Sequence, residues 1–411
     1  MQTKPIILEG KKIDKETLHK ALLKHFHGKD ARKILLIPPD ITRSHSGAGI
    51  ITGLYYDIFT QAGVETNILP ALGSHVPMTR EEQITFFGNI PAEHFLIHNW
   101  RDGVTALGEI PAAFVRETSE GLMDTAIPVQ VSNHLLDPSY DLIISIGQVV
   151  PHEVVGMANY TKNIVVGCGG SHFISASHMV GAFYGIERIL GKVDTPVRRL
   201  FDYAEENILT QLPLEYVLTV TDSGDIIGLY IGTGRELFVR AAALSSKRNI
   251  NYVERPINNC VVYLDEKEFH STWIGNKAVY RTRMAIADGG HLLILAPGVK
   301  VFGEDAENDR LIRKFGYTGR ERILRLCKSE EELQNNLSAA AHLIHGSADG
   351  RFNITYAAPF LGKEAVEGVG YQYMDWENAI KQYNPETLQP GFNGEVYFIP
   401  NPAVGLWQAD L

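Results

Sequence analysis

The sequence has few cysteines, no excess of positive charge and no long hydrophobic run. Its 411 residues include three cysteines, which are far apart in the chain. An odd number of distant thiols predicts no disulfide framework, and no Cys-x-x-Cys pair offers a zinc site. The formal charge of −10 argues against nucleic acid or an anionic membrane surface as the main partner.

Membrane-spanning and secretory segments are not predicted either. No stretch approaches the ~20 apolar residues of a membrane span, and the first residues contain no signal-peptide hydrophobic region. With 45% hydrophobic residues over 411 positions, the chain is long enough for two domains with separate cores. We therefore expect a soluble cytoplasmic enzyme with no nucleic-acid or membrane partner.

Several common catalytic motifs are also missing. No helix start carries Gly-x-Gly-x-x-Gly or Gly-x-x-x-x-Gly-Lys-Ser/Thr, so neither a dinucleotide fingerprint nor a P-loop is predicted. The nucleophile elbow Gly-x-Ser-x-Gly and the zinc motif His-Glu-x-x-His are absent as well. Any chemistry must therefore come from a different arrangement of residues.

Apolar segments alternate with segments of helical period along the chain, which predicts an α/β fold of two domains, each a mostly parallel sheet flanked by helices. We assign residues 1–250 to the first domain and 255–390 to the second, with 391–411 as a candidate return to the first. The polar stretch 246–256 marks the boundary, and the active site is expected in the cleft between the domains. Expected strands are 33–38, 64–69, 93–98, 141–147, 260–264, 291–296, 352–356 and 395–399. Expected helices are 14–26, 50–62, 273–287, 329–344 and one starting at 79, and 228–234 is expected to be a turn region.

Polar side chains follow each expected strand of the first domain. Arg43, His75, Arg101 and His152 come after the four strands in turn. Because the carboxyl ends of parallel strands meet at one edge of a sheet, we expect these residues to form a site there.

The stretch 147–178 adds Lys162, His172 and His178 to His152. Imidazoles and an amine after a buried strand indicate a metal or proton-transfer site. Three interpretations stay open at this point. His152, His172 and His178 could be the three protein ligands of a zinc hydrolase, the chain could be a non-catalytic carboxylate-binding protein, or these residues could simply satisfy loop backbone.

A joint pattern narrows the choice. The set Asp40-x-Thr42-Arg43, Gly73-x-His75, Pro151-His152, Lys162 and His178 resembles the nickel-dependent lactate racemase family over roughly residues 10–300. Lys277, which precedes Asp288-Gly-Gly290, matches the position of a substrate-binding lysine in that family.

The resemblance implies a cofactor and a reaction. The cofactor would be a nickel-pincer nucleotide supplied by cofactor-synthesis enzymes, and the activity a racemase or epimerase of 2-hydroxy acids, inverting C2 by hydride transfer to the cofactor. Lys162 would tether the cofactor, Asp40 and Thr42 would belong to its loop, and His178 would bind nickel. His75 and His152 would be the acid/base pair, and Arg43 and Lys277 would hold the substrate carboxylate.

The chain departs from the lactate enzymes at several positions. Residues 157–161 replace a serine- and glycine-rich run, Ile274 replaces a glutamine, and residues 333–336 lack the expected tryptophan. These departures predict a substrate larger or more polar than lactate, such as a sugar acid or a hydroxy-dicarboxylate. Residues expected to be structural or solvated are His45, His134, His172, Lys300, His342 and His345.

Overall fold

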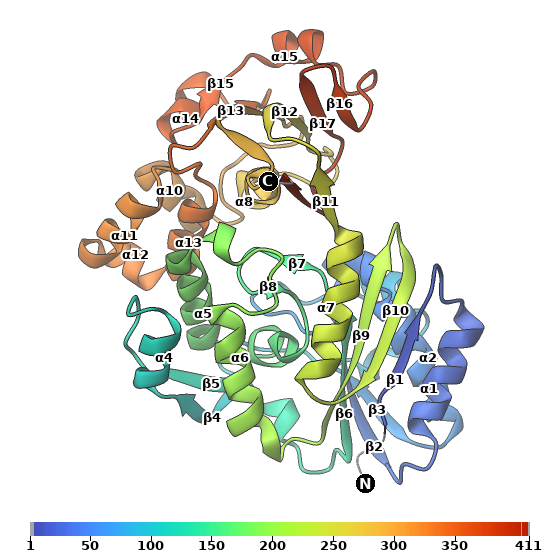
Figure 1. Cartoon of the computed structure of the whole chain (residues 1–411). Coiled ribbons are helices and arrows are strands. Elements are labelled where there is room, and N and C mark those ends of the chain that lie inside the picture. The colour runs from blue at the N-terminus through green and yellow to red at the C-terminus, as the bar shows by residue number, and fades with distance from the viewer. Residues whose placement is uncertain (1–3, 404, 410–411) are drawn as a thin grey trace. The chain divides into compact units, whose positions relative to one another are not determined.

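The computed structural model describes residues 4–403 and 405–409. The chain separates into two compact units, one of Met1–Ser177 and Gly191–Arg248 and the other of His178–Leu190 and Asn249–Leu411 (Figure 1). The unit boundary thus falls inside helix α5 (Ser171–Tyr184) and again just after Arg248. No helix in the described ranges is both long enough and apolar enough to cross a membrane.

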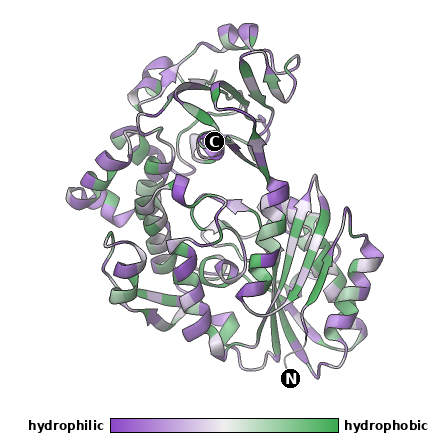
Figure 2. Ribbon diagram, in the orientation of Figure 1, coloured by the Kyte–Doolittle hydropathy of each residue, from purple (hydrophilic) through white to green (hydrophobic). Residues whose placement is uncertain are grey.

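The first unit is built on a six-stranded sheet of order β1-β10-β9-β6-β2-β3. β3, β2, β6 and β9 run parallel to one another, whereas β10 pairs antiparallel with β9 and β1 pairs antiparallel with β10. The central strands β2 and β6 are apolar on both faces, as a sheet covered by helices requires, and Figure 2 shows this hydrophobic sheet interior. The strands are β1 (Ile6–Glu9), β2 (Lys33–Ile37), β3 (Glu65–Ile68), β6 (Leu142–Gln148), β9 (Leu214–Asp222) and β10 (Asp225–Gly232).

Helices and two antiparallel strand pairs complete the first unit. Capping chemistry sets two helix starts: Asp14 accepts a hydrogen bond from Thr17 N, and Thr79 and Glu82 form a capping box. The helices are α1 (Lys15–Phe26), α2 (Ala48–Gln61), α3 (Arg80–Phe87), α4 (Ala112–Thr118), α6 (Pro196–Asn207) and α7 (Arg235–Asn249). The antiparallel pairs are β4 (Val104–Ile110) with β5 (Ile127–Ser132), which are connected through α4, and the hairpin of β7 (Pro151–His152) with β8 (Gly156–Met157).

The second unit has a six-stranded sheet of order β15-β14-β13-β12-β17-β16, in which only the β16–β17 pair is antiparallel. Its strands are β12 (Ile257–Tyr263), β13 (Ile286–Leu295), β14 (Asn353–Ala357), β15 (Gln372–Tyr373), β16 (Gly391–Asn393) and β17 (Val396–Ile399). A separate parallel pair joins β11 (Ile250–Val253) to β18 (Leu406–Ala409). The described C-terminal strands therefore pair within the second unit rather than returning to the first.

The helices of the second unit are mostly short. They are α8 (Thr272–Gly275), α9 (Lys277–Thr282), α10 (Ala306–Phe315), α11 (Arg320–Ser329), α12 (Glu331–Asn335), α13 (Leu337–His345), α14 (Lys363–Gly368) and α15 (Trp376–Gln382). Together with the two sheets they confirm the expected α/β class of mostly parallel sheets flanked by helices.

Four local expectations were wrong. Residues 93–98 form no strand: Ala92–His94 is a 3₁₀ turn, and Phe95 makes a single bridge to Ile68. The stretch 228–234 lies largely in β10, where Gly228 follows a bulge and packs against Leu244. The helix expected over 329–344 is divided among α11, α12 and α13, because the backbone turns extended at Glu330 and non-helical at Asn336. The helix expected over 273–287 is two short ones, α8 and α9, with Asn276 between them.

Candidate functional site

The loop after β2 and the loop after β3 meet through Asp40 and His75. Asp40 is buried and begins a 3₁₀ helix (Ile41–Ser46), where one carboxylate oxygen accepts hydrogen bonds from the backbone N and hydroxyl of Thr42. The other oxygen lies 2.6 Å from His75 Nδ1. Burial raises the pKa of Asp40, but the hydrogen bond and charge of His75 outweigh it, so the pKa lies below its ordinary value. The structure thus brings three predicted residues of the site region, Asp40, Thr42 and His75, into contact or close proximity.

This pairing fixes the protonation pattern of His75. An ionised carboxylate only accepts hydrogen bonds, so His75 Nδ1 carries the proton and Nε2 keeps its lone pair in the neutral ring. The His75 side chain is 57% exposed and can therefore be reached by a small molecule. Asp40 was expected to shape a cofactor loop, and the contact with His75 gives it an orienting role that the sequence did not show.

His152 lies in the β7–β8 hairpin and is only 7% exposed. Its Nδ1 accepts a hydrogen bond from the backbone N–H of Val154 at 3.1 Å. Because a backbone amide can only donate, the neutral His152 ring carries its proton on Nε2, opposite to His75. Glu153 lies 3.9 Å from the same Nδ1.

Lys162 follows two residues with left-handed backbone, Asn159 (φ 68°) and Tyr160 (φ 60°). Burial, followed by the positive charge of Arg43, lowers the pKa of the Lys162 amine to about 8, and the negative charge of Glu153 opposes this shift. These influences place Arg43, Glu153 and Lys162 within electrostatic range of one another. A half-buried amine with such a pKa is partly neutral near physiological pH and can act as a nucleophile.

Asn163 ties the Lys162 segment to the main sheet. Its side-chain amide donates to the carbonyl of Ile37 at 3.0 Å and to Ser145 Oγ at 3.1 Å, which are at the carboxyl-end halves of β2 and β6. A further backbone bond, from Gly73 N to Gly167 O at 2.8 Å, connects this segment to the loop that carries His75. Three contacts therefore position the Lys162 segment relative to β2, β6 and the loop that carries His75.

Arg198 of α6 stabilises the chain just before Lys162 through hydrogen bonds. It is fully buried and donates to the carbonyls of Met157 at 2.6 Å and Asn159 at 3.2 Å. Next to Lys162, Thr161 donates to Glu205 at 3.1 Å. The sequence did not predict roles for Arg198 and Glu205, because charged residues of an amphipathic helix are expected to lie at its surface. It also missed Asn163 and Glu153, for which local sequence gives no signal.

His178 and Lys277 belong to the second unit. His178 is half-buried in α5, and the segment that follows it is anchored by the fully buried Arg283, which contacts Glu187 at 2.6 Å. Lys277 begins α9 with its ammonium 5.7 Å from the Phe269 ring centre.

The neighbours of Lys277 are positioned by aromatic residues. Asn276 accepts a hydrogen bond from Tyr356 at 2.7 Å, and Trp273, one turn before Lys277, stacks on His342 at 4.2 Å. Burial lowers the pKa of His342 to about 3, so His342 is a neutral packing residue. This part of the second unit is a rigid aromatic support for α8 and α9.

Arg101 is not part of the sheet edge as expected. It lies in an exposed turn capped by Asn99, with its guanidinium 3.9 Å from the neighbouring Trp100 ring. His45 and His172 are exposed, and Lys300 lies over Phe360 at 5.2 Å.

The ligand set expected for a zinc hydrolase is not formed. In residues 4–403 and 405–409 no group of three or more His, Cys, Asp or Glu side chains is placed to hold a metal ion. A cofactor that contains most of the ligands of its metal requires two groups from the chain. The first is one side chain that binds the metal, and the second is a reactive lysine that holds the cofactor. Lys162, half-buried and with a lowered pKa, fits the second requirement.

The chain is similar to known proteins in its N-terminal sequence and in its fold. Residues 10–187 match the family model described as the lactate racemase N-terminal domain. The structure is similar to a crystal structure of a protein from Thermotoga maritima, with TM-score 0.82, 25% identity and coverage of 98% of this chain and 100% of that one. It is also similar to the lactate racemase apoprotein from Thermoanaerobacterium thermosaccharolyticum, with TM-score 0.73, 17% identity and coverage of 99% and 95%. No protein with a curated description matches significantly. The resemblance noted in the sequence is confirmed.

Proposed function

This chain is a homologue in the lactate racemase superfamily, and on that premise we propose that it is an isomerase that inverts C2 of a 2-hydroxy carboxylate. The observation that carries the proposal is the Asp40–His75 pair. A buried carboxylate that holds an exposed imidazole in the Nδ1–H tautomer leaves Nε2 free to take a proton. Such a base can remove the proton of the 2-hydroxyl group.

His152 complements His75 in this proposal. Inversion requires a second proton-handling group, because the oxygen that loses its proton on one side must regain one after the intermediate has turned. His152 presents a ring whose neutral form holds its proton on Nε2. To take up a proton at Nδ1, His152 must give up the hydrogen bond from Val154.

The cofactor assignment rests on Lys162 and His178. We propose that Lys162 holds a nickel-pincer nucleotide, that Asp40 and Thr42 contribute to its loop, and that His178 is the one protein ligand of nickel. When bound, this group would supply the hydride acceptor for C2. The lowered pKa of Lys162 supports the assignment, since attachment through nitrogen requires the neutral amine.

Two cations are proposed for the substrate carboxylate. Arg43 is exposed in the loop after β2, and Lys277 is half-exposed at the start of α9. A guanidinium and an ammonium would neutralise the acid and hold it while the rest of the molecule turns. Ile274 stands where the lactate enzymes are expected to have a glutamine, and residues 333–336 lack the expected tryptophan, so the pocket should differ from that of a lactate enzyme. We propose a substrate larger or more polar than lactate, such as a sugar acid or a hydroxy-dicarboxylate.

The decisive experiment is a panel of D- and L-2-hydroxy acids in deuterated water, with protein produced beside the cofactor-synthesis enzymes. Hydride return should leave protium at C2 of the inverted product. Deuterium at C2 would show carbanion chemistry by the same histidines, and the cofactor assignment would then be abandoned. Absence of inversion for every acid in the nickel-loaded protein would overturn the isomerase proposal itself.

A further inference from the structure

The chain just before Lys162 has an unusual backbone conformation. Asn159 and Tyr160 both have positive φ, 68° and 60°, and no other adjacent pair of non-glycine residues does so in the described ranges. Asparagine tolerates this left-handed region, but a bulky residue such as tyrosine is an outlier there. Strain of this kind persists only where the surrounding contacts over-determine the conformation, and it is concentrated at functional sites.

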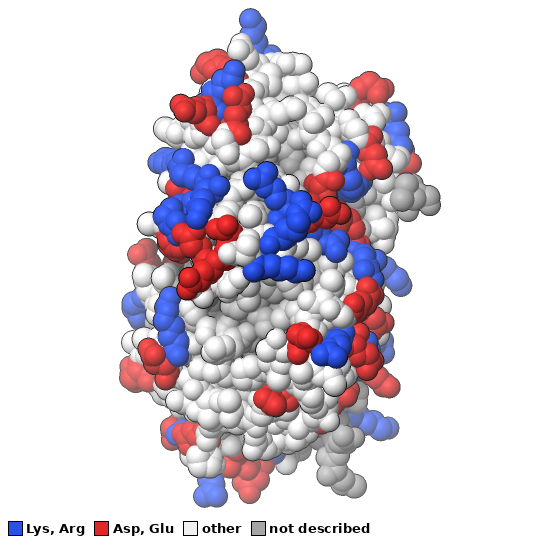
Figure 3. All heavy atoms as spheres, turned by 90° about the vertical axis from the view of Figure 1, so that its left-hand side faces the viewer, with Lys and Arg blue, Asp and Glu red and all other residues white. Residues whose placement is uncertain are grey.

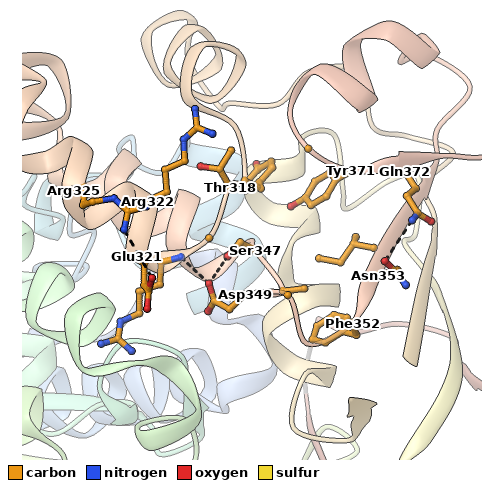
Figure 4. Close-up of a pocket in the computed structure, with 17 residues that line it drawn as sticks. Thr318, Glu321, Arg322, Arg325, Ser347, Asp349, Phe352, Asn353, Tyr371 and Gln372 are labelled. Atoms are coloured by element: carbon orange, nitrogen blue, oxygen red, sulfur yellow. Dashed lines mark hydrogen bonds and ion pairs between the residues drawn. The ribbon is translucent and has the colours of Figure 1, made fainter. Parts of the chain in front are cut away.

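Asp349 shows how a left-handed residue is accommodated elsewhere in the chain. It has φ 50° and lines a pocket of the second unit (Figure 4). Its short carboxylate accepts from the backbone N of Arg320 at 2.6 Å and from Ser347 Oγ at 3.0 Å, so hydrogen bonds close to its own backbone hold it. Tyrosine has no short polar side chain, and Tyr160 therefore depends on contacts with residues that are distant in the sequence.

Packing against the main sheet supplies part of this support. Tyr160 is 1% exposed, and its ring centre lies 4.3 Å from that of Tyr216 in β9. The Asn159 side chain accepts a hydrogen bond from the backbone N of Tyr160 at 2.6 Å. It also lies so close to β6 that a Cβ on Gly147 would be 1.9 Å from its amide nitrogen. A glycine in β6 is thus required for the conformation that precedes Lys162.

One face of α6 supplies the rest. Arg198 and Glu205 are seven positions apart, which is about two turns, so they lie along one side of the helix. Arg198 donates to the carbonyl of Asn159 at 3.2 Å, and Glu205 accepts from Thr161 Oγ1 at 3.1 Å. The helix therefore contacts the chain on both sides of Tyr160.

Arg198 and Glu205 differ from the charged residues at the surface. Figure 3 shows Lys, Arg, Asp and Glu side chains gathered there in groups of both signs, whereas Arg198 is fully buried and Glu205 half-buried. The same Glu205 oxygen, Oε2, accepts from Tyr216 and from Thr161, which are both fully buried. Burial raises the pKa of Glu205, and the hydroxyl groups of Tyr216 and Thr161 oppose this shift. Without Glu205, two buried hydroxyl groups would lose this acceptor.

Lys162 lies between two anchored residues. Asn163, which follows it, is bonded to β2 and β6, and Thr161, which precedes it, is bonded to Glu205. We propose that Glu205 is a positioning residue for Lys162, which holds Thr161 and the strained turn so that the lysine amine keeps its partly buried, reactive place. The proposal rests on the assignment of Lys162 as the attachment point of the cofactor, but its test does not require the cofactor.

The test is the pH dependence of Lys162 acylation in the full chain without cofactor, followed by peptide mass spectrometry. Thr161→Val keeps the β-branched shape but removes the hydroxyl group, so the turn is released and water reaches the amine. The profile should move from about pH 8 to higher pH by about one unit or more, toward the ordinary value of a lysine, which slows the reaction about tenfold below pH 8. Thr161→Ser keeps the hydroxyl group and should retain the original profile.

Variants of Glu205 separate the acceptor from the charge. Glu205→Leu and Glu205→Gln both remove the negative charge, but glutamine keeps an acceptor oxygen. Positioning predicts a shift to higher pH in Glu205→Leu and a profile close to the original in Glu205→Gln. Loss of the charge by itself would disfavour the ammonium and move both profiles to lower pH. Glu206→Leu is the matched control, because Glu206 is exposed on the same helix, and its profile should not change.

Two results would overturn the proposal. One is a profile that stays near pH 8 in Thr161→Val and Glu205→Leu, even if both variants unfold at lower denaturant concentration, because Glu205 would then stabilise the fold without positioning Lys162. The other is an equal shift in Glu205→Leu and Glu205→Gln, which would assign the effect to charge. Failure of the cofactor assignment is seen separately, as unmodified protein that carries no cofactor on Lys162 when it is produced beside the cofactor-synthesis enzymes, and the acylation profiles still decide the role of Glu205.

Discussion

His75 and His152 are the same residue type in the same unit, but their surroundings differ in every respect that matters for proton transfer. His75 is on an exposed loop and donates a hydrogen bond from Nδ1–H to a carboxylate, whereas His152 is buried in a hairpin and accepts a hydrogen bond from a backbone N–H at Nδ1. One neutral ring therefore offers a lone pair at Nε2, and the other a proton. The sequence predicts the two histidines as equivalent acid/base groups, whereas the folded chain holds their neutral rings in opposite tautomers.

The supports of the two histidines differ as well. His75 depends on one side chain, Asp40, for its orientation. His152 is part of a buried scaffold: the β8 strand it pairs with continues into the segment held by Arg198. Disturbing the first should change chemistry with little effect on stability, and disturbing the second should change stability first.

The largest effect is expected for Asp40→Asn. The asparagine amide can donate to His75 Nδ1 and so favour the tautomer with its proton on Nε2, which removes the base. The isosteric change in a carboxylate that orients a catalytic histidine has cost about 10⁴-fold in another enzyme, and we expect a decrease in kcat on the order of 10³- to 10⁴-fold here.

Steady-state racemisation kinetics would measure this loss, with Asp137→Asn, an exposed carboxylate of the same unit, as control. Nitrogen-15 NMR should show the His75 tautomer change. Retention of most activity with the altered tautomer would remove Asp40 from the mechanism.

His152→Gln is expected to have the next largest effect. Glutamine keeps an N–H near the Nε2 position but cannot carry an extra proton. If His152 moves a proton, kcat should fall about 10²- to 10³-fold, in line with general acid–base contributions, and His152→Ala should be no worse. If His152 only donates a hydrogen bond, the glutamine variant will stay close to the unmodified protein. His172→Gln, an exposed histidine of α5, should leave kcat unchanged.

Arg198→Met tests the buried scaffold. The change removes the donors to the Met157 and Asn159 carbonyls, and a buried polar group left without a partner costs roughly 1–3 kcal/mol. We expect the free energy of unfolding to decrease by about 2–4 kcal/mol. The neighbouring Arg199, paired with Glu117 at the surface, offers a matched control whose change to Met should cost less than about 0.5 kcal/mol. Chemical denaturation measures both, and equal losses would contradict the assigned role of Arg198.

The sequence predicts correctly those elements that are determined by their own residues, and it fails where contacts with distant residues decide the structure. The apolar runs of β2 and β6 and the capping box at Thr79 are local, and these elements lie where expected. The segment 93–98 has an apolar centre but makes only one bridge, because it does not run alongside β3 for more than a residue. Whether a short apolar segment joins a sheet is decided by its neighbours in space and not by its own residues.

In the site, too, the residue types could be predicted from the sequence, but the contacts between distant residues could not. Strand-end reasoning and the family pattern pointed to His75, His152 and Lys162, but the contact of Asp40 with His75 joins residues 35 positions apart. Arg198 and Lys162 are likewise brought together only by the packing of α6 under the Lys162 segment. Tautomers and lowered pKa values arise from such contacts, so the sequence could name the groups but not their protonation.

The smallest and most direct prediction concerns the reactivity of Lys162 in the cofactor-free protein. Its pKa of about 8 is below the ordinary value, so the neutral, nucleophilic fraction is large above pH 8 and falls about tenfold for each pH unit below it. Acylation by an amine-reactive ester, followed by peptide mass spectrometry, should show this profile, whereas a lysine in an unstructured peptide should follow an ordinary pKa near 10.4. Two variants should move the profile in opposite directions. Arg43→Gln removes a positive charge that disfavours the ammonium and should shift it to higher pH, and Glu153→Gln removes a negative charge that favours the ammonium and should shift it to lower pH. An unchanged profile in both variants would mean that burial alone sets the reactivity of Lys162, and the electrostatic influence of Arg43 and Glu153 on Lys162 would be refuted.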